Sequence, residues 1–269
     1  MVISLKQAYK LCCETLGKTD GRILFEGITK KRVADALTHP EQTVKADFEP
    51  LFERISQGEP IQYVVGETEF MGFPFKVTPD VLIPRQDTEL LCEWAEEMLK
   101  SKKEAKVLDI CTGSGCIAIS AQKITNAEVF ALDISEKALA VAEENRALND
   151  AKVKFFKADA HTFCGLDELD MVLSNPPYIE TEVVKGLDRN VRDFEPHLAL
   201  DGGKDGLDFY EDIAKNSMKM LKKGGALGVE IGYNQGKVVS EIIKKHFGNS
   251  KILKDLCGND RVVYGVKNI

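Results

Sequence analysis

The second part of the chain alternates between two kinds of segment, and this alternation limits the fold more than any other feature. Short apolar segments of strand length are separated by longer segments whose apolar residues recur at helical spacing. Such alternation predicts an α/β fold with a mostly parallel sheet and helices on both faces. Two strands around a Gly-Asn-Asp turn within 251–268 would add an antiparallel strand at or near one edge. The other predicted strands cover 105–110, 128–134, 153–159, 169–174 and 225–232, and the predicted helices 87–101, 114–124, 135–149, 206–221 and 234–247.

The first 70 residues show a helical pattern instead. Apolar residues at positions 5, 8, 9, 12 and 16 follow helical spacing, and segment 44–58 repeats the signal from Val44 to Ile55. From Glu69 the pattern changes, and apolar residues alternate around Gly and Pro as in a β-hairpin. We therefore expect a helical domain over residues 1–70, a β-hairpin linker over 71–84 and an α/β domain over 85–269.

Composition and charge argue against several classes of protein. No apolar run approaches the roughly 20 residues of a membrane-spanning helix, and the start MVISLKQAYKL lacks the apolar core of a signal peptide, so we expect a cytoplasmic protein. The seven cysteines form no CxxC pair and have no histidines at zinc spacing, which favours free thiols and predicts no metal site. The net charge of −7 argues against direct binding to long stretches of DNA.

Three predicted strands end in residues that suit a nucleoside. The segment VLDICTGSGC, 107–116, follows the first strand and has glycines that let the backbone approach a ligand. Asp133 ends the next strand, where a carboxylate can accept both hydroxyls of a ribose, and Asp159 ends the third, where a carboxylate can meet an adenine amino group. The spacing G-S-G is not that of dinucleotide sites, and no GxxxxGK[ST] loop is present. The pattern predicts a nucleoside-bearing cofactor.

The segment LSNPPYIE, 173–180, follows the fourth strand with a stiff loop, because proline lacks an amide donor and fixes its own φ. The combination DxCTGSG…D…D…NPPY resembles class I methyltransferases, which use S-adenosylmethionine. By this resemblance, the side-chain oxygen of Asn175 and the carbonyl of Pro176 accept the two N–H bonds of a planar NH2 group. Tyr178 would lie against the flat face of the substrate. No strong base is needed, because the proton becomes acidic once the methyl group is transferred.

Three further motifs narrow the resemblance. VLIPRQDTELL at 81–91, NPPYIE at 175–180 and EPHLALDGGKDGL at 195–207, behind a small helical domain, closely resemble the HemK/PrmC family of peptide chain release factor glutamine methyltransferases. The resemblance covers nearly the whole chain. It implies a seven-stranded Rossmann-like sheet and, as substrate, the glutamine in the Gly-Gly-Gln tip of class I release factors. The products would be N5-methylglutamine and S-adenosylhomocysteine, and we expect a monomer whose helical domain helps to hold the release factor.

The resemblance also implies roles for individual residues. The loop after the first strand borders the methionine end of the cofactor, and the acids that end the next two strands meet its ribose and adenine. The NPPY residues hold the substrate, with three of them in the catalytic step. The implied cofactor-binding residues are Cys111, Thr112, Gly113, Ser114, Gly115, Asp133, Asp159, Ala160 and Asn175; the catalytic residues are Asn175, Pro176 and Tyr178; and the substrate-binding residues are Asn175, Pro176, Pro177, Tyr178, Arg85 and Thr88.

Some positions depart from the family pattern. The family usually has glycine where Cys111 stands, so a side chain there narrows the approach to the cofactor or requires a φ that cysteine tolerates poorly. An aromatic residue often follows the third-strand acid, where this chain has Ala160. Asp87 or Thr88 would cap the helix that follows, and both would border the pocket with Arg85. Residues 179–203 show no clear regular structure, and we expect them to form part of the wall over the target glutamine.

Two other functions fit parts of the pattern. An adenine-N6 methyltransferase acting on DNA or RNA would use the same NPPY geometry, because adenine N6 and a glutamine amide both present a flat NH2 group. It would need a basic recognition surface, which the acidic composition does not favour. A non-catalytic binding module with this fold would not need the intact NPPY segment.

Overall fold

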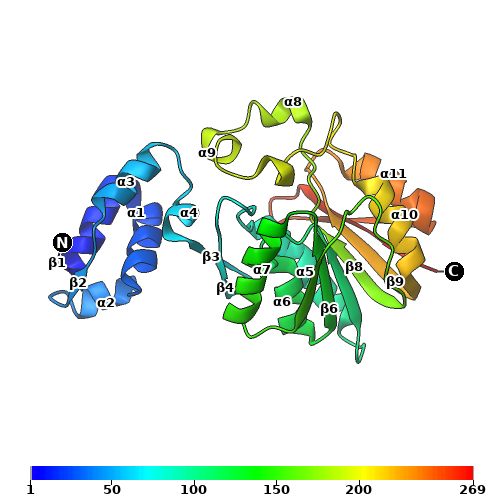
Figure 1. Ribbon diagram of the computed structural model, residues 1–269, viewed down its shortest axis with the longest axis horizontal. Helices are drawn as coiled ribbons and strands as arrows, with labels where there is room; N and C mark the ends of the chain where they lie inside the picture. The colour runs from blue at the N-terminus through cyan, green and yellow to red at the C-terminus, as the bar shows by residue number, and fades with distance from the viewer. Residues whose placement is uncertain (1, 269) are drawn as a thin grey trace.

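A seven-stranded sheet forms the centre of the computed structural model, which describes residues 2–268 (Figure 1). The strands lie in the order β10-β11-β9-β8-β5-β6-β7, and all neighbouring pairs from β9 to β7 are parallel. β11 runs antiparallel to β9 and to β10, which forms the edge, so the predicted α/β fold and terminal hairpin are confirmed. The strands are β5 (Lys106–Ile110), β6 (Glu128–Asp133), β7 (Val153–Lys157), β8 (Leu169–Ser174), β9 (Leu221–Glu230), β10 (Lys251–Lys254) and β11 (Asp260–Val266).

Helices cover both faces of this sheet. α5, α6 and α7 pack on one face, and α10 and α11 pack on the other (Figure 1). Successive strand residues point to opposite faces: Val107 packs in the core that includes Trp94 of α5, whereas Leu108 packs in the core that includes Tyr210 of α10. Burial on both faces explains why β8 is buried along its whole length. The helices are α5 (Glu89–Leu99), α6 (Cys116–Thr125), α7 (Glu136–Leu148), α10 (Tyr210–Met220) and α11 (Gly236–Phe247).

The first part of the chain forms a separate helical layer beside the sheet (Figure 1). Its core includes Leu5, Leu24, Phe25 and Phe48, all at most 1% exposed. The predicted helix from Val44 is wrong at its start, because residues 43–45 form a strand that pairs antiparallel with residues 2–4, a contact that local periodicity does not reveal. The elements are β1 (Val2–Ser4), α1 (Leu5–Thr29), α2 (Val33–Thr38), β2 (Thr43–Lys45), α3 (Glu49–Ser56) and α4 (Ile61–Val65).

A β-hairpin joins the two parts, as predicted. β3 (Glu67–Phe70) pairs antiparallel with β4 (Phe73–Lys76) across a Met71-Gly72 turn whose two residues have positive φ, as tight hairpin turns require. Asn145 of α7 fixes the hairpin, since its side-chain amide accepts a hydrogen bond from the Lys76 amide and donates one to the Lys76 carbonyl. The domain limits at residues 70 and 84 stay a prediction.

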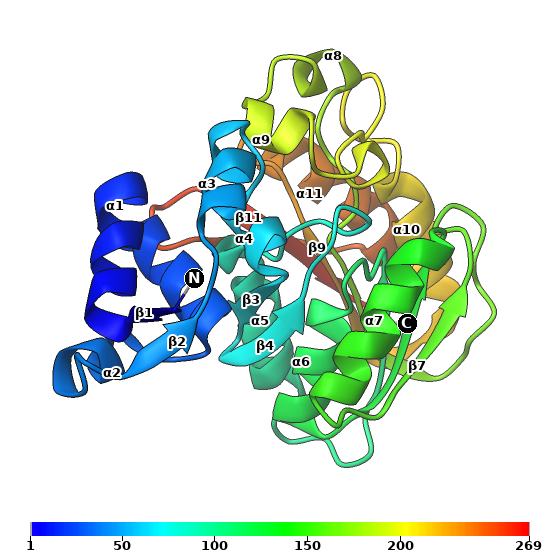
Figure 2. The same cartoon turned by 60° about the vertical axis from the view of Figure 1, so that its left-hand side comes forward.

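Segment 179–203 is more regular than expected. It forms two short helices, α8 (Thr181–Val184) and α9 (Arg189–Arg192), and a 3-10 turn, η2 (His197–Ala199), so the prediction of a segment without regular structure is wrong (Figure 2). Helices of four residues are too short to give a periodic sequence signal. Val184 anchors the segment with no exposed surface.

The starts of α7 and α5 differ. Ser135 caps α7, because its side-chain oxygen accepts the Ala138 amide at 3.2 Å. Thr88 stands at the N-cap position of α5, one of the two positions predicted, but its side chain makes no cap bond; it lies with Asp87 in a 3-10 turn, η1 (Gln86–Thr88). Its hydroxyl contacts the site described below.

No helix within residues 2–268 has the length and apolarity to cross a membrane.

Candidate active site

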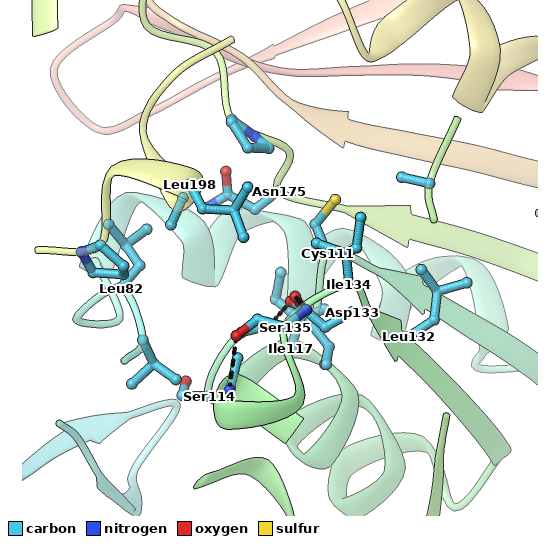
Figure 3. Close-up of a pocket in the computed structure, with 18 of the residues that line it drawn as sticks. Leu82, Cys111, Ser114, Ile117, Leu132, Asp133, Ile134, Ser135, Asn175 and Leu198 are labelled. Atoms are coloured by element: carbon cyan, nitrogen blue, oxygen red, sulfur yellow. Dashed lines mark hydrogen bonds between the residues drawn. The ribbon is translucent and has the colours of Figure 1, made fainter. Parts of the chain in front are cut away.

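A cavity of about 270 Å³ opens at the carboxyl ends of β5, β6 and β8. The sheet register explains its place, because Ile110 at the end of β5 pairs with both Leu132 and Ser174, so the loops that follow these strands begin side by side. Figure 3 shows Asp133 and Asn175 approaching the cavity from different strands. Of the residues predicted for the site, the cavity is lined by Arg85, Thr88, Cys111, Thr112, Gly113, Ser114, Asp133, Asp159, Ala160, Asn175 and Pro177.

The loop after β5 forms one side of the cavity. Asp109 Oδ2 accepts the Thr112 hydroxyl at 2.6 Å, which tightens the turn. Gly113 has φ of +53°, and a Cβ there would contact nothing within 4 Å, so the backbone is open toward the cavity. Gly115 does not line the cavity. It directly precedes α6 with φ of +81°, and a Cβ added to it would lie 3.2 Å from the side chain of Ala142.

Asp133 ties two cavity loops together. Its Oδ2 accepts the Gly113 amide at 2.9 Å. Its Oδ1 accepts the amide of Ser135, also at 2.9 Å (Figure 3). Burial raises the pKa of Asp133, and these backbone N–H groups act in the opposite direction. The carboxylate is therefore fixed in place at a strand end, where its remaining lone pairs are available to hydroxyl groups of a ligand.

Cys111 shows both consequences expected of a side chain at this position. Its φ is +62°, in the left-handed region that favours glycine, and its side chain lines the cavity (Figure 3). Burial raises the pKa of its thiol above the ordinary value, with the carboxylates of Asp133 and Asp109 adding to the rise. The thiol is therefore neutral and narrows the cavity without adding charge.

The NPPY loop presents two hydrogen-bond acceptors. Asn175 Nδ2 donates to the Thr88 hydroxyl at 3.3 Å, and this bond directs the side-chain oxygen of Asn175 away from Thr88. Within residues 2–268, no group donates to that oxygen or to the Pro176 carbonyl. Pro176 and Tyr178 do not line the cavity; Pro176 is buried, and the Tyr178 hydroxyl donates to Glu230 at 3.2 Å. Their predicted catalytic roles stay predictions.

An aromatic wall stands near the end of β7. Phe209 lines the cavity and stacks on His161 with ring centroids 4.5 Å apart. Asp159 lies two residues beyond β7 and accepts the His161 amide at 2.9 Å, while His161 Nδ1 lies 3.0 Å from Asp212. The sequence interpretation missed Phe209, although it is the first aromatic residue after the DGGKDG turn. Phe209 gives the cavity an aromatic ring, which Ala160 does not.

Segment 179–203 forms part of the rim, as predicted for the wall of the cavity. Leu198 lines the cavity with 58% of its surface exposed (Figure 3). The guanidinium of Arg85, just after the linker, pairs with the buried Glu195 carboxylate and so holds this segment in place. Asp87 does not border the cavity as expected; it pairs instead with Arg261 of β11 at 2.9 Å. Other lining residues that the sequence interpretation missed include Leu82, Ile117, Ile134 and Pro196.

Comparison with known proteins places this site in a family. A family model described as the PrmC N-terminal domain matches residues 8–66, and one described as the methyltransferase small domain matches residues 87–193. A release factor glutamine methyltransferase of Flavobacterium psychrophilum is 40% identical over 254 residues, covering 90% of this chain and 88% of that protein. The chain belongs to the release factor glutamine methyltransferases. A second member, from Clostridium botulinum, is 39% identical over 255 residues, and the match covers 91% of this chain and 90% of that protein.

Membership of the release factor glutamine methyltransferases confirms the resemblance drawn from the motifs, and it favours glutamine methylation over both alternative functions. The fold agrees with it. A methyltransferase from Pyrococcus furiosus has the same fold with a TM-score of 0.55 at 21% identity, covering 82% of this chain and 100% of that chain.

Proposed function

We propose that this protein transfers a methyl group from S-adenosylmethionine to the side-chain amide nitrogen of the glutamine in the Gly-Gly-Gln motif of class I peptide chain release factors. The observation that carries the proposal is Asn175, which lines the cavity and whose side-chain oxygen accepts no hydrogen bond among residues 2–268; the carbonyl of the next residue, Pro176, also accepts none. A carboxamide NH2 group has two N–H donors, so a pair of fixed acceptors matches it. Such acceptors bind the group without a strong base.

The residues at the carboxyl ends of β5, β6 and β7 fit the nucleoside part of the cofactor. Asp133 would accept its ribose hydroxyls, Asp159 would face the adenine, and the backbone of Gly113 leaves space for the ligand. When bound, S-adenosylmethionine supplies an activated methyl group on a sulfonium. The product is S-adenosylhomocysteine.

The chain's own contribution is orientation. The amide nitrogen of glutamine is a poor nucleophile, because its lone pair is delocalised into the carbonyl. Asn175 and Pro176 would accept both N–H bonds and hold the nitrogen toward the donor, and the fixed proline geometry means that little ordering remains for the reaction. Correct alignment of reacting groups contributes about 7–11 kcal/mol at best. Tyr178, which belongs to the same loop, would lie against the flat face of the substrate.

A continuous rim would receive the release factor. The side chain of Arg189 in α9 packs close to Gly58, just after α3: a Cβ added to Gly58 would lie 3.4 Å from Arg189 Cδ. The helical layer and segment 179–203 therefore meet there (Figure 2). We propose that residues 1–70 bind the release factor, that 71–84 link the two parts and that 85–269 carry the reaction. The protein would act as a monomer in the cytoplasm and would not bind DNA directly.

Mass spectrometry of a purified class I release factor tests the proposal. Incubation with this protein and S-adenosylmethionine should add one methyl group to the tip glutamine. A release factor whose tip glutamine is replaced by alanine is the matched control and should gain no methyl group. Methyl incorporation into DNA or RNA, with none into the release factor, would instead support the adenine-N6 activity. No heat of S-adenosylmethionine binding in calorimetry would support a non-catalytic module.

A further inference from the structure

A buried side-chain amide binds the backbone of the NPPY loop. Gln235 stands at the N-cap position of α11, is 8% exposed and does not line the cavity. Its Nε2 donates to the Tyr178 carbonyl at 3.0 Å and to the Gly206 carbonyl, at the end of the DGGKDG turn, at 3.1 Å. Its Oε1 accepts the Gly232 amide at 2.8 Å. One side chain therefore connects the NPPY loop, the DGGKDG turn and the loop before α11.

The partners of Gln235 fix the direction of its amide. A carbonyl oxygen only accepts hydrogen bonds, and a backbone N–H group only donates them. The two carbonyls therefore require the Nε2 end, and the Gly232 amide requires the Oε1 end. Both donors of this buried side chain are paired, as is usual for a polar group removed from water.

The NPPY loop depends on this contact because it has few donors of its own. Pro176 and Pro177 carry no amide hydrogen. Among residues 2–268, Gln235 is the one side chain that donates a hydrogen bond to the backbone of 175–178. Beyond the loop, the Ile179 amide donates to the Leu200 carbonyl at 3.0 Å. Gln235 therefore holds the stretch between the end of β8 and Ile179.

The carbonyls of the Pro-Pro-Tyr segment have different surroundings. The Tyr178 carbonyl is held by Gln235. The Pro177 carbonyl lies against Gly202, where an added Cβ would approach it to 2.7 Å. The Pro176 carbonyl accepts no hydrogen bond within residues 2–268. This packing leaves the Pro176 carbonyl as the backbone acceptor of the loop for a substrate N–H group.

We propose that Gln235 is a positioning residue for methyl transfer: it fixes the NPPY backbone against the DGGKDG turn, and so holds the acceptors on Asn175 and Pro176 at the cavity. This inference rests on the proposed function. Gln235 acts through the loop, since it does not line the cavity itself. A misplacement of about 1 Å between reacting groups lowers a rate by about 100-fold, so a loop released from Gln235 aligns the substrate nitrogen poorly.

Gln235→Glu separates the two ends of the side chain. The carboxylate has nearly the same size and keeps an acceptor for the Gly232 amide. In place of Nε2, however, it directs an oxygen at the Tyr178 and Gly206 carbonyls, and these oxygens repel one another. We expect kcat for release factor methylation to fall at least about tenfold. The KM for S-adenosylmethionine should change less than about threefold, because the loops after β5 and β6 are held separately, by Asp133.

Gln122→Glu is the matched control for this substitution. Gln122 lies in α6, is 7% exposed, and its Oε1 accepts the Lys152 amide at 3.2 Å. The change therefore also buries a carboxylate that keeps one backbone amide, but it makes no contact with the NPPY loop. Denaturant unfolding should show a lower free energy of unfolding for both variants, whereas kcat should fall only for Gln235→Glu.

Gly206→Ala tests the same contact from the turn. A Cβ added to Gly206 would lie 2.4 Å from the Tyr178 carbonyl oxygen and 2.7 Å from Gln235 Nε2. Gly248→Ala is its control, because Gly248 has φ of +73° against +72° for Gly206, and a Cβ there would contact nothing within 4 Å. Both substitutions strain the backbone equally, so a fall in kcat of at least about tenfold for Gly206→Ala alone reports the displaced loop.

Several outcomes would overturn this inference. One is a folded Gln235→Glu protein that keeps kcat within about threefold of wild type, and another is an equal fall in kcat for Gln122→Glu. A KM for S-adenosylmethionine that rises as much as kcat falls would show a general disturbance of the site instead. If Gln235→Glu does not fold, equal kcat values for Gly206→Ala and Gly248→Ala refute the inference. A wild-type protein that transfers no methyl group to the release factor overturns the proposed function, on which the inference rests.

Discussion

Removal of the Asn175 side chain tests the acceptor pair most directly. Asn175→Ala deletes one of the two oxygens proposed to accept the substrate N–H groups and leaves the Pro176 carbonyl in place. Loss of one preorganised group that acts in the transition state costs about 2–4 kcal/mol. At about 1.36 kcal/mol for each tenfold change in rate, kcat should fall about 30- to 900-fold.

The same change should affect folding little. Asn175 makes one side-chain hydrogen bond among residues 2–268, to Thr88 at 3.3 Å. A lost hydrogen bond of this kind lowers the free energy of unfolding by about 1 kcal/mol. Asn259→Ala is a matched control, because it removes a side-chain amide bond of the same length, 3.3 Å to Asp255, at a turn far from the cavity.

Methyl incorporation into the release factor, followed by mass spectrometry at saturating substrates, gives kcat for wild type and both variants. Calorimetry gives the affinity for S-adenosylmethionine, which should stay within about threefold for Asn175→Ala because the proposed bond is to the substrate amide. A fall in kcat of less than tenfold for Asn175→Ala, or an equal fall for Asn259→Ala, would refute the reasoning.

Three other substitutions have expected outcomes. Asp133→Ala should raise the KM for S-adenosylmethionine at least about tenfold in steady-state kinetics, because it removes the proposed ribose acceptor and frees the Gly113 amide. In denaturant unfolding, Cys111→Val should lower the free energy of unfolding by about 1–3 kcal/mol more than Cys111→Gly does, since a β-branched residue is poorly tolerated at φ of +62°. Burial raises the pKa of Asp109 to about 7, so its stabilising contribution is present in acid and is lost as pH rises through about 7. Between pH 5 and 8 the free energy of unfolding should therefore fall by a few kcal/mol more for wild type than for Asp109→Asn; equal slopes would contradict this.

The sequence alone determined the order and type of most elements in residues 85–268. Short apolar segments and helical spacing are local signals, and they predicted each strand of the large sheet to within a few residues. The strand ends and the family resemblance together predicted that Asp133, Asp159 and Asn175 belong to one site, and all three line the cavity. Asp133 is the last residue of its strand, Asn175 follows its strand directly, and Asp159 lies two positions beyond its strand.

The tertiary structure decided the contacts between residues far apart in the chain. The pairing of β2 with β1, the place of Phe209 in the cavity and the pairing of Asp87 with Arg261 all depend on long-range packing, which leaves no local pattern. Glu230 is the strongest example. In the sequence it is one acid within an apolar strand, whereas in the folded protein it is 1% exposed and accepts the hydroxyl of Tyr178, which lies 52 residues earlier in the chain. Only the fold brings this carboxyl to the NPPY loop, because no local pattern links the two segments.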